Sequence, residues 1–185
     1  MDITSMKEHL YDVVGALHEV HRELGPGLNE CCYQEGLEME LAERHISFLR
    51  ELTFHPKYHG KEMNSTFRLD FLCKGDIIVE CKSVPELTNI HRAQLFNYMF
   101  MTKYPCGVLV NFMPSFAVIE RYFYDDDSQN LLTVSGTIIQ RKRYFFLTTT
   151  LLFVFDDNSL AVFRRQQRQQ GQQSACGFLT TTQTT

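Results

Sequence analysis

The stretch FRLDFLCKGDIIVECKS, residues 67–83, decides the fold. Its first half alternates apolar and polar side chains, which is typical of a strand with one face buried. Residues 74–76 (KGD) are a tight-turn signal, and the apolar run 77–79 (IIV) that follows suits a central strand. The stretch therefore predicts a β-hairpin whose turn brings Asp70 beside Glu80.

Three ionisable side chains of this hairpin suggest a metal-binding site. Glu80 and Lys82 are two residues apart, so they share one face of a strand, and Asp70 lies on the partner strand. Two carboxylates with water suit Mg²⁺ or Mn²⁺, which polarises a phosphodiester, while Lys82 could orient water or stabilise developing charge. The alternative is a solvent-facing Glu–Lys pair, because a D…ExK spacing also arises by chance.

Helices are predicted on both sides of the hairpin in the chain. Apolar residues recur at helical spacing over 4–24, and the GPG sequence at 25–27 ends that helix. A second helix is predicted from the N-cap residue Asn29 to about His45, and a third from a cap at Thr88 to about Thr102.

Strands fill most of the remaining sequence up to residue 124. They are expected over 46–58, 65–73, 77–84, 107–112 and 115–124. The order α-α-β-β-β-α-β-β predicts an α/β or α+β protein with a central mixed sheet flanked by helices.

Two of these helices carry polar groups on faces that should pack inward. Glu30 and Tyr33 lie three residues apart, and His91, Gln94 and Tyr98 follow one stripe of the later helix. Simpler interpretations exist: a first-turn glutamate is favoured by the helix dipole, and an amphipathic helix can have a polar seam.

The composition sets limits on function. The chain has 185 residues, 44% of them hydrophobic and 22% charged, which is ordinary for a globular protein. The net charge of −4 excludes a polybasic nucleic-acid binder, so any such contact needs a local basic patch or a metal-filled acidic site. The 6 cysteines lack zinc spacing, the N-terminus is polar, and no run is long enough to span a membrane. A cytoplasmic protein with free thiols is expected.

A change in composition near Tyr124 predicts two parts. Residues 1–124 form the expected domain, and residues 125–185 form a C-terminal extension. This extension is rich in Gln and Thr towards its end and is expected to be partly disordered, because such tracts have little to bury.

Several motifs together resemble a known family. GPGLNECCY at 25–33 matches a GxxExxY signature at Gly27, Glu30 and Tyr33, and the match continues through the hairpin, HRAQLFNYM at 91–99 and GVLVNF at 107–112. The chain thus resembles the GxxExxY proteins, a group similar to the PD-(D/E)XK nuclease superfamily. The resemblance implies a restriction-endonuclease-like αβββαβ core, which agrees with the strand order predicted above.

The resemblance also implies roles for individual residues. Asp70, Glu80 and Lys82 would be the D…ExK triad, with the carbonyl of Cys81 as a further metal ligand and Glu30 as the helix acid that completes the metal shell. Glu35 is a weaker candidate for that acid because it lies outside the signature. The implied substrate-binding residues are Gln94 and Tyr98, as a QxxxY motif, together with Tyr33.

The predicted function is a Mg²⁺- or Mn²⁺-dependent nuclease that hydrolyses phosphodiester bonds in nucleic acid, with DNA as the expected substrate and no membrane partner. The alternative is a catalytically silent nucleic-acid-binding or regulatory module that keeps the fold, and a weaker one is an interaction protein. The oligomeric state is open, with a homodimer as one option.

Overall fold

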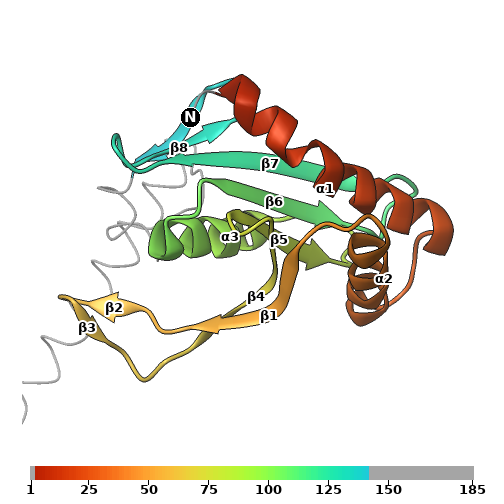
Figure 1. The fold of residues 1–185 in the computed structure, drawn as a ribbon, viewed down its shortest axis with the longest axis horizontal. Helices are drawn as coiled ribbons and strands as arrows, with labels where there is room; N and C mark the ends of the chain where they lie inside the picture. Colours follow the sequence, from red (N-terminus) through yellow and green to blue (C-terminus); the bar gives the residue numbers. More distant parts are fainter. Residues whose placement is uncertain (1–2, 142–185) are drawn as a thin grey trace, which may run out of the picture. The chain divides into compact units, whose positions relative to one another are not determined.

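The computed structural model describes residues 3–141, which lie within one compact unit of the chain, residues 1–149. The helices are α1 (Ile3–Leu24), α2 (Glu30–Glu43) and α3 (Asn89–Thr102). The strands are β1 (Phe48–Phe54), β2 (Lys57–Tyr58), β3 (Lys61–Glu62), β4 (Phe67–Cys73), β5 (Ile77–Lys82), β6 (Cys106–Asn111), β7 (Val118–Asp125), β8 (Asn130–Thr133) and β9 (Ile138–Arg141). Figure 1 shows their arrangement.

Seven strands form one mixed sheet in the order β1-β4-β5-β6-β7-β8-β9, and β2 and β3 form a separate ribbon. Among the strands of residues 3–141, β5 and β6 are the one parallel pair, because α3 carries the chain across the sheet between them. The central mixed sheet flanked by helices confirms the predicted fold class, and the predicted hairpin is β4–β5.

The helices α1 and α2 cover one face of the sheet. The apolar stripe predicted for the first helix is buried at Leu10, Val13, Leu17 and Val20. These side chains share one core with Tyr33 and Leu37 of α2 and with alternate residues of β5 and β6. The apolar face of each helix, set by the 3.6-residue period, therefore packs against one face of the strands, set by the two-residue period.

Helix α3 packs on the opposite face. Cys106 and Val108 belong to the core with α1 and α2, so Gly107 between them faces the other way. A β-carbon at Gly107 would lie 2.4 Å from the Met99 sulfur atom of α3, so a larger residue here would force the Met99 side chain to move. The sheet is thus buried on both faces at its centre.

Two predicted boundaries differ from the structure. The strand expected over 46–58 is divided, because Pro56 has no N–H for a ladder hydrogen bond and the chain passes from β1 into β2. The sheet also continues beyond residue 124: β8 pairs with the end of β7, and β9 pairs with β8. Residues 125–141 therefore belong to the sheet rather than to an appendage, and the Gln/Thr-rich tracts predicted to be disordered lie outside the described residues.

No helix within residues 3–141 is long and apolar enough to cross a membrane.

Candidate active site

A fork between two neighbouring strands forms the centre of the site. Strands β4 and β5 pair from Cys73–Ile77 to Phe71–Val79 and then separate, β4 staying with β1 and β5 staying with β6. Asp70 and Glu80 are the next residue on each strand. The Cys81 backbone N–H donates to Asp70 Oδ2 across the fork at 2.8 Å, which fixes the carboxylate beside β5.

Glu80 and Lys82 share a face of β5, as the two-residue spacing predicted. Lys82 Nζ donates to Glu80 Oε1 at 2.6 Å; the Glu80 side chain is buried, with 1% exposed, and the Lys82 side chain is partly buried, with 11% exposed. The second carboxylate oxygen, Oε2 of Glu80, is buried without a hydrogen-bond partner in the described part of the chain. A buried, unpartnered carboxylate oxygen is costly and needs an explanation.

Cys81 lies between these two residues and points the other way. Its side chain is fully buried in the core beneath α1 and α2. Burial, together with the nearby carboxylates, raises the pKa of its thiol well above the ordinary value. A thiol held in this state is not a nucleophile, so any role of Cys81 in the site belongs to its backbone.

Glu30 is the first residue of α2, and the structure brings it to the fork. Burial raises the pKa of its carboxyl, Lys82 lowers it, Asp70 raises it, and a hydrogen bond with the Ser83 backbone lowers it. These couplings place Glu30 beside the other three groups. The Ser83 hydroxyl also donates to the Leu28 carbonyl at 2.6 Å, which ties the loop before α2 to the end of β5.

The site holds three carboxylates and one ammonium, and the pKa values reflect the imbalance. Burial and the neighbouring Asp70 raise the pKa of Glu80 to about 7, although Lys82 opposes them. Burial raises the pKa of Asp70 as well, against the lowering effects of the Cys81 amide and Lys82. Burial alone would lower the pKa of Lys82, but the carboxylates outweigh it and raise the pKa, so Lys82 keeps its proton. A cation placed here would relieve the excess negative charge.

The residues present fit a divalent cation. Within residues 3–141, no three His, Cys, Asp or Glu side chains already stand in a metal-binding cluster. Asp70 Oδ2 and Glu80 Oε1 are instead engaged by the Cys81 amide and by Lys82. The free Glu80 Oε2 and the all-oxygen donor set are nonetheless what Mg²⁺ or Mn²⁺ requires.

Two α3 residues that were predicted from the sequence, Gln94 and Tyr98, also lie near the fork. Gln94 Nε2 donates to the Tyr98 hydroxyl at 3.0 Å. Burial raises the pKa of Tyr98, Gln94 lowers it, and Glu80 and Asp70 raise it further, so the phenol lies within the electrostatic field of the carboxylates. The rings of Phe54 and Phe67 pack edge-on against Tyr98 and hold it in place.

Tyr33 corrects one sequence-based expectation. Its side chain is fully buried and stacks on Phe112 at a centroid distance of 4.6 Å, so substrate has no access to it. The hydroxyl donates to the Gly25 carbonyl at 2.7 Å and accepts the Leu28 amide at 3.1 Å. Tyr33 therefore shapes the loop that leads to Glu30 and does not face a substrate.

Gln34 of α2 also contributes to the site, although it was not among the residues predicted from the sequence. Hydrogen bonding from its side chain lowers the pKa of the Asp70 carboxyl, which burial raises. The signal was present in the sequence: Gln34 follows Glu30 by four residues and so lies on the same face of α2. Glu35, the weaker acid candidate, is exposed on α2.

This arrangement of a mixed sheet forked around acids and a lysine defines a restriction-endonuclease-like protein. The family model described as "PD-(D/E)XK nuclease superfamily" matches residues 7–122 of the 185. The chain belongs to the PD-(D/E)XK nuclease superfamily, whose members generally use divalent metal ions.

Among solved structures, the chain is similar to the crystal structure of SSO0001. The two are 21% identical with a TM-score of 0.40, and the similarity covers 48% of this chain and 46% of that one. The chain thus spans about half the length of that structure. No curated protein matches the chain.

Proposed function

We propose that this protein is a metal-dependent nuclease that hydrolyses phosphodiester bonds, with DNA as its substrate. The observation that carries the proposal is the convergence of Asp70, Glu80, Glu30 and Lys82 at the β4–β5 fork, with Glu80 Oε2 buried and unpartnered among the described residues. Membership of a nuclease superfamily supports the hydrolytic chemistry.

The three carboxylates would hold Mg²⁺ or Mn²⁺, with the carbonyl of Cys81 as a further oxygen ligand. These are hard oxygen donors, which both cations prefer. When bound, the ion polarises the phosphodiester and lowers the pKa of a bound water.

Lys82 acts as a charged donor and not as a general base, because its raised pKa keeps it protonated at neutral pH. Its hydrogen bond to Glu80 holds the ammonium at the fork, where it can position the attacking water or stabilise charge on the phosphate. Gln94 and Tyr98 organise the substrate side from α3, and Gln34 positions Asp70 from α2.

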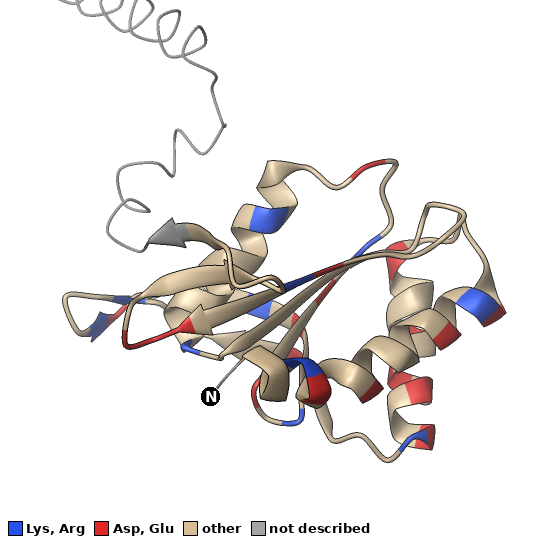
Figure 2. Cartoon of the chain, turned by 90° about the horizontal axis from the view of Figure 1, so that it is seen from above, with Lys and Arg blue, Asp and Glu red and all other residues tan. Residues whose placement is uncertain are grey.

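The charge distribution limits how a polyanion can approach. Helix α2 carries five glutamates and no Lys or Arg, and Figure 2 shows these acidic positions in red along the helix. Arg50 and Arg44 pair with Glu38 and Glu40, but the remaining glutamates leave α2 with a negative charge that disfavours the approach of phosphates to its outer face. The substrate strand therefore reaches the fork from the side of α3, where Gln94 and Tyr98 stand.

Within the superfamily, we assign the chain to the GxxExxY group. Each signature residue has a physical role that supports this assignment. Gly27 has φ +93°, a backbone conformation that favours glycine. Glu30 lies at the fork, and Tyr33 holds the intervening loop through its two hydrogen bonds.

The test is a cleavage assay on linear, circular and single-stranded DNA, and on RNA, with Mg²⁺ or Mn²⁺. Wild-type protein should cleave DNA, and Lys82→Ala should not. Lys103→Ala is the matched control, since Lys103 also pairs with a carboxylate but lies in a different cluster. Metal binding without cleavage of any substrate would contradict the proposal and favour a silent binding module.

A further inference from the structure

His91, in the first turn of α3, has a fixed tautomer. The Thr88 backbone N–H donates to its Nδ1 at 3.1 Å, and the Thr88 side chain in turn accepts the backbone N–H of His91, which together form a capping box. Because Nδ1 accepts a hydrogen bond, the neutral ring carries its proton on Nε2. Within residues 3–141, Nε2–H has no hydrogen-bond partner.

This free donor lies on the helix stripe that meets the active site. His91, Gln94 and Tyr98 are spaced at i, i+3 and i+7, so they share one face of α3. Tyr98 feels the Glu80 and Asp70 charges. His91 lies at the Lys82 end of this helix face. Burial is the main cause that lowers the pKa of His91, and the Lys82 ammonium lowers it further.

The turn that carries His91 is held rigidly. The guanidinium of Arg92, the next residue, binds both Glu120 oxygens of β7 at 2.8 and 2.5 Å. A second contact joins Arg92 to the Leu87 carbonyl at 3.3 Å. A neutral N–H donor fixed beside a lysine favours a ligand that is anionic and rich in acceptors, as a phosphodiester is.

We propose that His91 binds the substrate by donating its Nε2–H to a phosphate oxygen next to the one under attack. The inference rests on the proposed function and adds a substrate contact that the D…ExK groups, Gln94 and Tyr98 do not supply. It also gives α3 a substrate-binding edge that runs from His91 to Tyr98.

The competing interpretation is that His91 only caps the helix, and two variants separate the roles. Thr88→Ala and His91→Ala both break the capping box, but only the second removes the imidazole. His91→Gln keeps a side chain of the type usual at this position of a capping box.

The measurements are kcat and KM on the DNA that wild type cleaves best, with the melting temperature and the Mn²⁺ affinity by calorimetry. Both His91 variants should lower kcat/KM by about 10- to 100-fold, as expected for a lost hydrogen bond to a charged group. Thr88→Ala should lower only the melting temperature, and His91→Gln should restore the melting temperature without restoring activity. The Mn²⁺ affinity should be unchanged throughout.

If His91→Ala cleaves as well as Thr88→Ala, the inference is overturned while the proposed function stands. If wild type binds a labelled oligonucleotide without cleaving it, hydrolysis is overturned, and an unchanged Kd of His91→Ala would then overturn the inference as well. If wild type neither binds nor cleaves nucleic acid, both proposals fail.

Discussion

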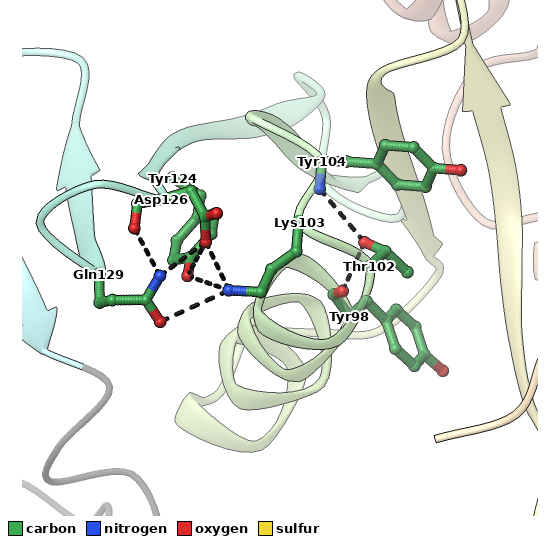
Figure 3. A network of polar contacts seen from close by, with 7 residues as sticks. All are labelled: Tyr98, Thr102, Lys103, Tyr104, Tyr124, Asp126 and Gln129. Atoms are coloured by element: carbon green, nitrogen blue, oxygen red, sulfur yellow. Dashed lines mark hydrogen bonds and ion pairs between the residues drawn. The ribbon is translucent and has the colours of Figure 1, made fainter. Parts of the chain in front are cut away.

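Two lysine–carboxylate pairs of nearly equal length behave in opposite ways. Lys82 lies 2.6 Å from Glu80, and Lys103 lies 2.5 Å from Asp126. The pKa of Glu80 is raised to about 7, mainly by burial, whereas hydrogen bonding from Lys103 lowers the pKa of Asp126. Figure 3 shows the second pair within its network.

The surroundings explain the contrast. Asp126 is 60% exposed, and it also accepts hydrogen bonds from the Tyr124 hydroxyl and the Gln129 amide. Its single charge is therefore balanced without any ligand. Glu80 is buried beside two further acids, and Lys82 is the cation that forms a hydrogen bond with it. The length of an ion pair thus says little about function, and uncompensated buried charge says more.

The largest expected effect is on catalysis. Asp70→Asn removes one negative charge from the fork and should reduce kcat by about 10²–10³-fold, the size typical of losing one electrostatic element of a site. It should also abolish the rise in melting temperature that Mg²⁺ gives the wild type by mass action. Asp126→Asn is the matched control and should retain both properties. Equal activity of the two variants would remove the distinction drawn between the two clusters.

The second effect is on the pH dependence of stability. The folded state holds the Glu80 proton with a pKa of about 7, against 4.5 for an ordinary glutamate. The stabilisation from protonated Glu80 is therefore complete below about pH 4.5 and is lost as the pH rises to about 7, on the order of 3 kcal/mol in all.

Glu80→Gln should accordingly unfold like the wild type at pH 4 and be the more stable protein at pH 8, although it is inactive. Urea denaturation in EDTA at both pH values measures this. A stability difference that stays constant between pH 4 and pH 8 would show that burial and the neighbouring carboxylates do not raise the pKa of Glu80 in the folded state.

The sequence predicted the proximity of the residues at the β4–β5 fork better than that of the residues around Lys103, and the reason is physical. Glu80 and Lys82 occupy alternate positions of a short strand, so their common face follows from the backbone period alone. The hairpin turn likewise brought Asp70 to β5. The Lys103 network depends on the turn between β7 and β8, where Gln129 has a positive φ that no local pattern announces.

The incorrect predictions likewise concern features that depend on contacts between distant parts of the chain. Tyr33 was predicted to face substrate because it belongs to a signature with Glu30, but helical spacing does not tell whether an inward tyrosine meets a ligand or the core. Phe112, which covers its ring, lies at the end of β6, so only the packing of α2 against the sheet reveals the contact. The end of the domain was placed at residue 124 because the composition changes there, whereas β7 ends at Asp125 and a short turn leads from it to β8.

A smaller effect is expected at the loop between α1 and α2, which leads into Glu30. Tyr33→Phe keeps the stacking on Phe112 but removes the bonds to Gly25 and Leu28, which should cost about 1 kcal/mol in urea denaturation. Because that loop carries Glu30, the Mn²⁺ affinity should weaken as well. Tyr11→Phe, at an exposed position on α1, controls for the loss of a hydroxyl. Unchanged metal affinity in Tyr33→Phe would show that the hydrogen bonds of this loop do not position Glu30 for metal binding.

The smallest effect is at Asp126, and its sign is opposite to that at Glu80. The pKa of Asp126 is lowered from 3.8, so its stabilising contribution is present above that value and disappears as the pH falls through the folded-state pKa. Asp126→Asn should lower the melting temperature slightly at pH 7 and by progressively less as the pH falls below 3.8, the reverse of the Glu80→Gln profile. The exposed pair should also weaken in 1 M salt, since screening acts on solvent-accessible charges. Parallel pH profiles for the two variants would mean that burial does not distinguish these two lysine–carboxylate pairs.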